Sequence, residues 1–268
     1  MNCKKKPPVL IITGYGVNCE AESKAAWEMA GAHVSTIHLH DLLDNPDILC
    51  DFKALMFIGG FSFGDHMGSG LVLALRLKQH MQHYLQRFIE NGHLVLGICN
   101  GFQVMVKIGL LPGLGHDYFT QKISLMQNEC GTFQNFWVNV SFEPDCTCVF
   151  THGLETMPLP IRHGEGKIFT TDKRILEQIE TSHCVACRYV DSQSGKRTMK
   201  FPNNPNGSLN AIAGMCDPTG RIFALMPHPE AYLFPENHPD WQRQKLNGTL
   251  PERGLGLKIF QNAVEYLT

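Results

Sequence analysis

A single cysteine stands between two glycines in the stretch LVLGICNGFQ, residues 94–103. Gly97 lies two positions before Cys99 and Gly101 two positions after it, where an apolar run gives way to a helix-like segment. A sharp strand-to-helix turn needs small residues at these positions, because larger side chains would collide there. The turn also places the thiol at the positive end of the helix, which favours the reactive thiolate. Cys99 is therefore the predicted nucleophile.

Residues that could activate this thiol occur near the end of the chain, in MPHPE. His228 and Glu230 are two positions apart, so in an extended segment their side chains point to the same side. The carboxylate of Glu230 can then orient the imidazole of His228, which acts as the general base toward Cys99. Pro229 between them stiffens the pair. The three side chains predict a Cys-His-Glu triad.

The stretch FIGGFSFGD is the candidate for stabilising a reacting carbonyl group. Gly59 and Gly60 let the backbone approach a ligand closely. The backbone N–H of Gly60 or Phe61, together with that of Asn100, is predicted to stabilise the oxyanion of an acyl intermediate. Gln103 lies one helical turn beyond Cys99 and is predicted to face the same pocket and contact a polar substrate. A phosphate-binding loop is not expected, because no Lys-Ser or Lys-Thr follows the glycines.

Nearly continuous apolar runs predict the buried parallel strands that would position these residues. The runs are residues 9–14, 33–39, 54–60 and 94–98. An amphipathic pattern over residues 71–88 predicts a long helix between the last two runs. Strands alternating with helices imply an α/β fold, an open, mostly parallel, twisted sheet with helices on both faces. In such sheets ligands bind at the carboxyl ends of the strands.

After about residue 111 the pattern changes to short strand-like runs separated by Gly, Pro and Asn. The runs are FWVNVSF, CTCVF, HCVACRYV, NAIAGMC and RIFALM. They predict an antiparallel or mixed extension of the sheet, closed by a helix at residues 257–267. Residues 233–253, rich in Pro, Asn and His, are expected to form a long surface loop. The whole chain, residues 1–268, is expected to be one domain.

Composition excludes several classes of partner. The 23 basic and 25 acidic side chains are interspersed, so neither nucleic acid nor an anionic membrane is an expected partner. The start of the chain has a basic cluster and only a short apolar run, which predicts no signal peptide and a cytoplasmic location. The ten cysteines are expected to be free thiols and not metal ligands. Cys184 and Cys187 would point to opposite faces of a strand. Cys146 and Cys148 could share a face, but no second pair at metal-ligand spacing stands beside them.

Five motifs, in this order, resemble the class I (triad-type) glutamine amidotransferases: GGFSFGD, GICNGFQ, HGEGK, NPNGS and MPHPE. Within that class they resemble the glutaminase subunits of phosphoribosylformylglycinamidine synthases, which act in purine biosynthesis. The resemblance implies a flavodoxin-like fold and a glutaminase in which Cys99 attacks the side-chain amide of glutamine and forms a thioester. His228 would move the proton and Glu230 would orient the histidine. The family's glutamine-binding roles carry over to Gly60, Phe61 and Gln103.

The same resemblance implies partners and cofactors. Ammonia would pass to a synthetase subunit that uses ATP and Mg²⁺, with a small accessory subunit as a candidate third component, while this chain would hold no cofactor. His163 and Glu165, in HGEGK, would lie near the pocket or the subunit interface. Two features depart from the family pattern: Ala231 follows His-Pro-Glu where the family usually has arginine, and the loop at residues 233–253 is long.

Three alternatives share part of this pattern. One is another class I amidotransferase subunit, and the second is a cysteine hydrolase of the DJ-1/PfpI type, which shares the cysteine turn. The late His-Pro-Glu and the NPNGS stretch are not expected in such hydrolases. The third is a docking subunit that has kept the fold without the activity, against which the intact triad residues argue. Assays of the purified chain with glutamine and with peptides separate an amidotransferase from a hydrolase of the DJ-1/PfpI type.

Overall fold

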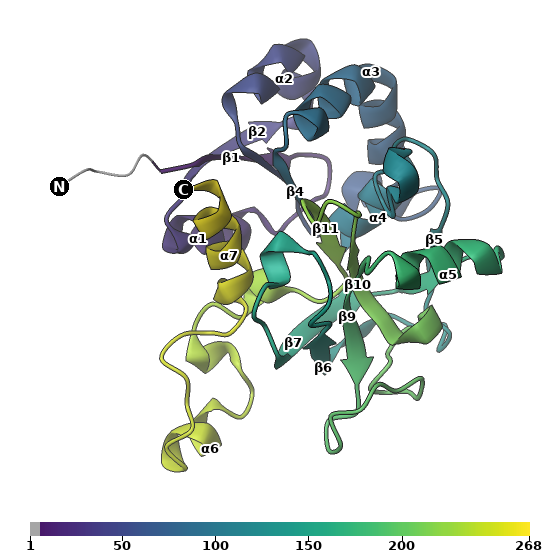
Figure 1. The fold of residues 1–268 in the computed structure, drawn as a ribbon. Helices are drawn as coiled ribbons and strands as arrows, with labels where there is room; N and C mark the ends of the chain where they lie inside the picture. Colours follow the sequence, from purple (N-terminus) through teal and green to yellow (C-terminus); the bar gives the residue numbers. More distant parts are fainter. Residues whose placement is uncertain (1–5) are drawn as a thin grey trace.

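The apolar runs of the N-terminal half form most of the parallel half of a nine-stranded sheet (Figure 1). The computed structural model describes residues 6–268, so the lysines at positions 4 and 5, part of the predicted basic cluster, lie outside the described residues. The strand order is β2-β1-β3-β4-β11-β10-β9-β6-β7. Neighbouring strands from β2 to β11 in this order are parallel, and all later pairs are antiparallel. The predicted α/β fold with an antiparallel extension is confirmed.

The strands of the main sheet are β1 (Pro8–Thr13), β2 (His33–His38), β3 (Ala54–Phe57), β4 (Leu94–Ile98), β6 (Gln134–Phe142), β7 (Thr156–His163), β9 (Val185–Val190), β10 (Ile212–Cys216) and β11 (Ile222–Leu225). A separate antiparallel pair consists of β5 (Ser124–Gln127) and β8 (Glu165–Phe169). The α-helices are α1 (Glu20–Ala30), α2 (Leu39–Asp44), α3 (Leu71–Glu90), α4 (Asn100–Ile108), α5 (Lys173–Thr181), α6 (Trp241–Leu246) and α7 (Leu257–Leu267). The 3₁₀ turns are η1 (Pro46–Asp51), η2 (Ser62–Asp65), η3 (Leu114–His116), η4 (Val149–Thr151), η5 (Leu209–Ala211), η6 (Pro229–Ala231) and η7 (Pro235–Asn237).

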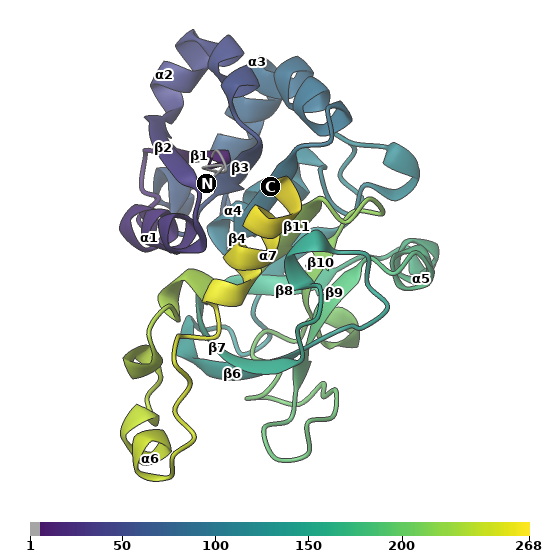
Figure 2. The same ribbon diagram turned by 60° about the vertical axis from the view of Figure 1, so that its left-hand side comes forward.

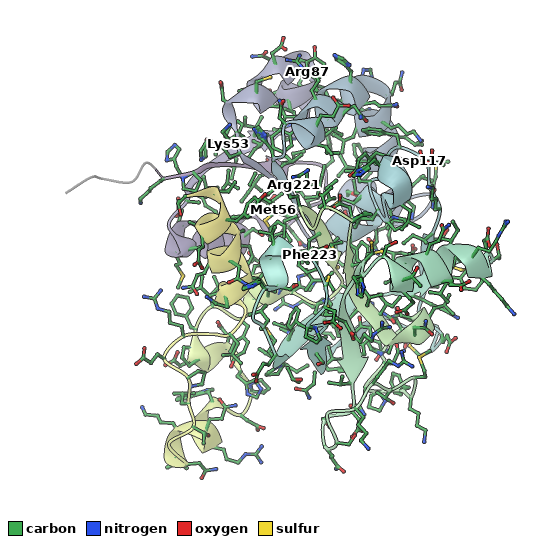
Figure 3. All side chains as sticks on the ribbon, in the orientation of Figure 1. Lys53, Met56, Arg87, Asp117, Arg221 and Phe223 are labelled. Atoms are coloured by element: carbon green, nitrogen blue, oxygen red, sulfur yellow. The ribbon has the colours of Figure 1, made fainter. Side chains whose placement is uncertain are left out.

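Helices cover both faces of the parallel half. Helix α1 contacts α7 on one face, and α3 contacts α4 on the other (Figure 2). The indole of Trp27 on α1 meets the ring of Phe260 on α7 edge to face, with the ring centroids 5.4 Å apart. Met56 on β3 and Phe223 on β11 are fully buried in the middle of the molecule (Figure 3). This double cover explains why the parallel strands read as continuous apolar runs.

The structure corrects two predictions in the C-terminal half. The CTCVF stretch is not a strand, because its first three residues form a loop and the rest belongs to η4. The backbone N–H of Val149 donates to the carbonyl oxygen of Gly220 (2.9 Å), outside any strand pair. Residues 233–253 are not a plain loop, since they contain η7 and α6.

One strand of the main sheet, β7, gave no signal in the sequence. It contains Pro158 and Pro160, and it lies at the edge of the sheet, where a missing N–H leaves no broken ladder bond. Within the part of the chain that the structure describes, none of the helices has the length and apolarity that a bilayer-spanning segment needs.

The topology gathers the candidate site residues at one edge of the sheet. Strands β3, β4 and β11 are neighbours and parallel, so their carboxyl ends meet at the same edge. Gly60 follows β3, Cys99 follows β4 and His228 follows β11. Residues more than 160 positions apart in the sequence are thereby brought to one place, as the switch-point rule for open α/β sheets predicts.

Candidate active site

Cys99 occupies a strained turn between β4 and α4. Its φ is +52°, a left-handed value that costs a non-glycine residue free energy and that the surrounding structure must enforce. A side chain at Gly101 would collide with the carbonyl oxygen of Phe57 on β3, and one at Gly97 would collide with the backbone of Gly101 and the side chain of Met105. The two glycines therefore remove the collisions that the sequence pattern predicted.

His228 and Glu230 form a buried pair. The Nδ1 atom of His228 lies 2.6 Å from Oε1 of Glu230, and both side chains are almost completely buried. The backbone N–H of His228 donates to the carbonyl oxygen of Pro160 on β7 (2.8 Å), which fixes the position of the ring. The Nε2 atom has no hydrogen-bond partner among the described residues. Nε2 of His228 is thus free to exchange a proton with a substrate or a thiol.

The environment of His228 favours its charged form. Burial by itself lowers the pKa of His228, but the Glu230 carboxylate and then the charge on Cys99 outweigh it and hold this pKa well above the ordinary value. A protonated imidazole next to a thiol stabilises the thiolate, which is the nucleophilic form. The pair is therefore suited to hold a thiolate on Cys99 and to return a proton to a leaving group.

Cys99 and His228 face one cavity of about 270 Å³ at the carboxyl edge of the sheet. The residues that line it are Asn18, Cys19, Glu22, Gly60, Phe61, Cys99, Phe133, Asn135, Arg162 and His228. The Sγ atom of Cys99 lies 3.5 Å from the backbone carbonyl oxygen of Arg162. The predicted nucleophile and base thus share a single cavity that is open to small molecules.

Two of the predicted oxyanion donors remain available, and one does not. The N–H of Phe61 donates to the carbonyl oxygen of Gly16 (2.9 Å), so it is already engaged. Among the described residues, no acceptor takes the N–H of Gly60 or that of Asn100, which is the first residue of α4. Phe61 contributes its ring instead, half-exposed at the cavity and 6.1 Å from the ring of Phe133.

The structure does not bring Gln103 to the cavity. Its Nε2 donates to the carbonyl oxygen of Glu165 (2.5 Å), and its Oε1 accepts from the side chain of Asn100 (2.9 Å). The carboxylate of Glu165 in turn accepts the N–H of Ser69 (3.3 Å). Gln103 and Glu165 therefore tie α4 and β8 together beneath the turn, and neither lines the cavity.

His163 is a buried neutral histidine near the His228–Glu230 pair. Its Nδ1 lies 3.1 Å from Oδ1 of Asn128, while its Nε2 is buried without a partner among the described residues. Burial first, and then the charge on His228, lower the pKa of His163 to about 3. The residue does not line the cavity.

The buried His163 predicts that the protein loses stability in mild acid. The unfolded chain binds a proton here below the ordinary pKa of 6.5, whereas the folded chain does so only near 3. The free energy of unfolding therefore falls as the pH drops from 6.5 toward 3, with a contribution from His163 of about 1.4 kcal/mol per pH unit. His228 has a raised folded pKa, so its contribution is complete below 6.5 and is lost only as the pH rises. Urea unfolding at several pH values measures the slope.

The matched variants for this measurement are His163→Gln and His80→Gln, the second on the exposed face of α3. His163→Gln should reduce the slope of unfolding free energy against pH by about one proton. His80→Gln should leave the slope unchanged. A His163→Gln slope equal to that of the unmutated chain would contradict a neutral, buried His163.

A second cysteine lies beside the predicted triad, and it is not among the site residues predicted from the sequence. Cys19, directly before α1, has its Sγ within 4.8 Å of the ligand atoms of His228 and Glu230. These three side chains could in principle hold a metal ion, but the direct 2.6 Å contact between His228 and Glu230 leaves no room for an ion between them. Burial raises the pKa of Cys19, so it remains a thiol and does not compete with Cys99. In the sequence, Cys19 is part of the stretch VNCE, residues 17–20, which was the available signal for this cysteine.

Two charged side chains of the cavity were also missed. Glu22 on α1 and Arg162 on β7 line the cavity, and neither has an ion-pair partner among the described residues. They come from elements that are distant in the sequence, so no local pattern indicates their proximity. Opposite charges on one small cavity suit a zwitterionic ligand.

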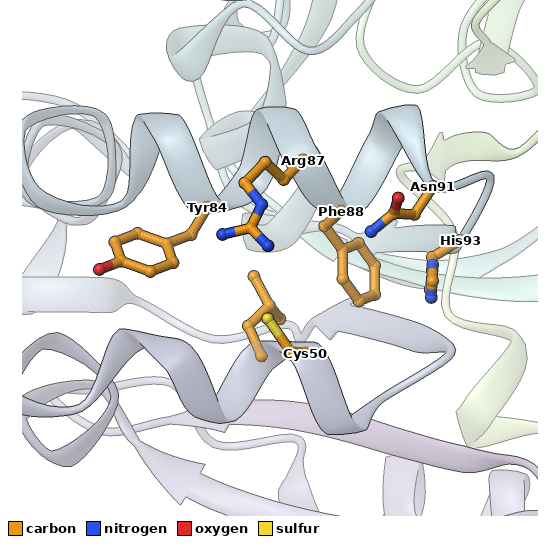
Figure 4. A pocket seen from close by; sticks show the side chains of 7 residues that line it. Cys50, Tyr84, Arg87, Phe88, Asn91 and His93 are labelled. Atoms are coloured by element: carbon orange, nitrogen blue, oxygen red, sulfur yellow. The ribbon is translucent and has the colours of Figure 1, made fainter.

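A second hollow, of about 140 Å³, lies between α3 and η1 (Figure 4). Arg87 and His93 line it, together with Cys50 and the rings of Tyr84 and Phe88. None of the predicted catalytic residues lines this hollow. The chemistry is therefore assigned to the cavity around Cys99.

Comparison with known proteins gives a consistent result. A model of the CobB/CobQ-like glutamine amidotransferase domain matches residues 6–267. A Dehalococcoides mccartyi protein named phosphoribosylformylglycinamidine synthase subunit PurQ is 42% identical over 97% of this chain and 98% of that protein. The protein of the same name from Methanococcus maripaludis is 40% identical over 98% of both chains. The solved structure of PurLQS from Thermotoga maritima matches 98% of this chain and 100% of that chain, with 29% identity and a TM-score of 0.71.

Proposed function

The chain belongs to the family of CobB/CobQ-like glutamine amidotransferase domains, and from this premise we propose that the cavity around Cys99 hydrolyses the side-chain amide of glutamine. It is a class I glutamine amidotransferase and acts as the glutaminase subunit of a phosphoribosylformylglycinamidine synthase in purine biosynthesis. The whole chain, residues 1–268, works as one glutaminase domain. The observation that carries the proposal is the meeting of Cys99, on its strained turn, with the buried His228–Glu230 pair in one cavity.

The reaction follows from the positions of these groups. The Cys99 thiolate attacks the amide carbon of glutamine, and the N–H groups of Gly60 and Asn100 stabilise the oxyanion. Protonated His228 gives its proton to the leaving nitrogen, so ammonia departs and a glutamyl thioester remains on Cys99. Neutral His228 then takes a proton from water, which attacks the thioester and releases glutamate. Glu230 keeps Nδ1 of His228 oriented in both half-reactions.

The unpaired charges of the cavity suit the zwitterionic end of glutamine. We assign the α-ammonium group of the substrate to Glu22 and the α-carboxylate to Arg162, because both line the cavity and neither has another ion-pair partner among the described residues. Charge-assisted hydrogen bonds of this kind are stronger than neutral ones. The rings of Phe61 and Phe133 lie beside the bound substrate and shield it from water.

Loss of either charge should weaken glutamine binding more than it slows chemistry. Glu22→Gln and Arg162→Gln should each raise KM for glutamine about 10-fold or more, since a hydrogen bond to a charged group contributes about 1.5–3 kcal/mol. The value of kcat should change much less, because neither residue touches the reacting carbonyl group. Steady-state glutaminase kinetics measure the split. Arg174→Gln, at an exposed position on α5, is the control that should change neither constant. Unchanged KM in both cavity variants would remove these two residues from the substrate site.

Ammonia made here needs an acceptor on another polypeptide. The relatives are named as subunits, and the Thermotoga maritima structure is that of PurLQS, which supports assembly with a synthetase subunit and a small accessory subunit. The synthetase is assigned ATP and Mg²⁺, which activate the ribotide amide, and this chain is assigned no cofactor. We assign the complex to the cytoplasm, where purine precursors are made, with neither nucleic acid nor membrane as a partner.

The test is reconstitution of the complex. The chain is used to capture its partners from a native extract, and the complex is assayed with glutamine, ATP and formylglycinamide ribotide. Formation of the amidine product with glutamine as nitrogen donor is the expected result. The isolated chain should hydrolyse glutamine slowly, because uncoupled ammonia release is wasteful. Rapid glutamine hydrolysis without partners, or a complex that aminates a different acceptor, would contradict the assigned role.

A further inference from the structure

A group of cysteines comes together where the loop before η4 packs on β10. Cys146 and Cys148 lie in that loop, and Cys216 is the last residue of β10, where its N–H donates to the carbonyl oxygen of Cys184 (2.8 Å). The Sγ atoms of Cys146 and Cys216 are 3.4 Å apart, although 70 positions separate these residues in the sequence. No pattern in the sequence indicates this contact, because the notable cysteine spacings are local ones. None of these cysteines lines the catalytic cavity.

The two thiols of the close pair differ in access. Cys216 is fully buried, whereas Cys146 is partly exposed and lines a hollow of about 360 Å³ beside α7. The hydrogen bond with Cys216 lowers the pKa of Cys146, and the same contact raises the pKa of Cys216. Cys146 is thus the thiol that solvent reaches and that ionises first, with Cys216 directly behind it as the second thiol.

We propose that Cys146 and Cys216 form a redox modification site that closes into an intramolecular disulfide when the chain meets a low-molecular-weight disulfide such as oxidised glutathione. The Cys146 thiolate attacks one sulfur of the oxidant, which breaks the S–S bond and releases one thiolate. Cys216 then loses its proton to solvent and attacks the Cys146 sulfur, which displaces the second thiolate. Two protein thiols are oxidised, and one disulfide is reduced to two thiols.

The surrounding backbone allows the two sulfur atoms to approach. Cys216 is fixed in β10, but Cys146 lies outside any helix or strand, just after a turn in which its N–H donates to the carbonyl oxygen of Glu143 (3.2 Å). The next anchor is the hydrogen bond from Val149 to Gly220 (2.9 Å). Only the short segment between these anchors must move. Because most cytosolic disulfides form transiently, the pair is expected to be reduced under ordinary conditions and to oxidise when the glutathione pool does.

Peptide mapping of the full-length chain tests the proposal. The reduced protein is equilibrated with defined ratios of oxidised to reduced glutathione, quenched with an alkylating reagent and digested without reductant. A peptide pair linked through Cys146 and Cys216 should appear as the ratio rises and disappear with dithiothreitol. Cys146→Ser should abolish the link, and Cys148→Ser, at the neighbouring cysteine of the loop, should leave it. A link through Cys148, or glutathione adducts without any link, would overturn the proposal.

A second measurement does not depend on mapping. Joining residues 70 positions apart restricts the unfolded chain, so the oxidised protein should unfold at a higher urea concentration than the reduced one. The shift should be absent in Cys146→Ser, whose partly exposed position tolerates serine. Equal urea midpoints for the oxidised and reduced protein would contradict a disulfide that bridges β10 and the loop.

Discussion

Replacing Cys99 with alanine should abolish glutamine-dependent synthesis by the complex while ammonia-dependent synthesis persists. In the proposed mechanism the sulfur of Cys99 becomes acylated, and Cys19 cannot replace it, because burial keeps Cys19 in its thiol form. A loss of about 10⁴-fold or more in kcat is expected, as for removal of a nucleophile from other catalytic triads. Product formation with glutamine and with ammonium chloride as nitrogen sources measures both activities on one preparation.

The two activities separate a chemical effect from a structural one. Parallel loss of both would mean that Cys99→Ala damages assembly and would leave the nucleophile unidentified. Cys19→Ala is the matched variant, since it removes the other buried thiol of the same cavity. It should still form an adduct at Cys99 with an electrophilic glutamine analogue that carries a diazoketone. An adduct on Cys19 in the Cys99→Ala chain would contradict the assignment.

Replacing His228 with alanine should have the second largest effect. Proton transfer by a positioned side chain contributes about 10²–10⁴-fold, and His228→Ala should lower kcat for glutamine hydrolysis by a factor in this range. Glu230→Ala should lower it less, because orienting and charging the imidazole contributes less than supplying it. Steady-state kinetics of each variant, with glutamine and with ammonia, measure the order.

Glu230→Gln gives a sharper version of this comparison. The glutamine side chain introduced at position 230 can still contact Nδ1 of His228, but it carries no negative charge to hold the pKa of His228 high. His228 should therefore lose its proton at a lower pH. The basic limb of the pH–activity profile should shift to lower pH with it. An unchanged basic limb, or a Glu230→Ala defect larger than that of His228→Ala, would contradict these roles.

Much of the fold was predictable because its signals are local. Buried parallel strands give continuous apolar runs, and the run at residues 94–98 coincides with β4. The closing helix at residues 257–267 coincides with α7. The turn at Cys99 was predictable from two glycines, since only a missing side chain fits against the carbonyl oxygen of Phe57. The predicted His228–Glu230 contact is present, but the extended backbone expected for it is wrong, because Glu230 lies in the 3₁₀ turn η6.

The remaining features depend on tertiary contacts that no local pattern encodes. The N–H of Phe61 is engaged by Gly16, which comes from a different loop. Gln103 has the expected helical position but turns to the backbone of Glu165. Glu22 on α1 and Arg162 on β7 meet at the cavity. No local pattern in the sequence indicates that these two elements lie close together. Strand β7 itself was hidden by prolines that only an edge position accommodates.

The two departures from the family pattern lie close together in the chain. Ala231 is the last residue of η6, and its N–H donates to the carbonyl oxygen of His228 (3.2 Å), so the backbone of the triad segment is intact without arginine. The segment after it carries α6, which projects away from the sheet (Figure 1). Neither departure reaches the cavity, because no residue of this segment lines it.

The central claim is that glutamine is cleaved through a thioester on Cys99. The most direct measurement is acid quenching of the chain during glutamine turnover, followed by mass spectrometry of the intact protein and its peptides. A mass increase of one glutamyl group, confined to the peptide of Cys99 and absent from Cys99→Ala, is the predicted result. Turnover at full rate with no covalent species on this chain, or with the group on another residue, would contradict the account.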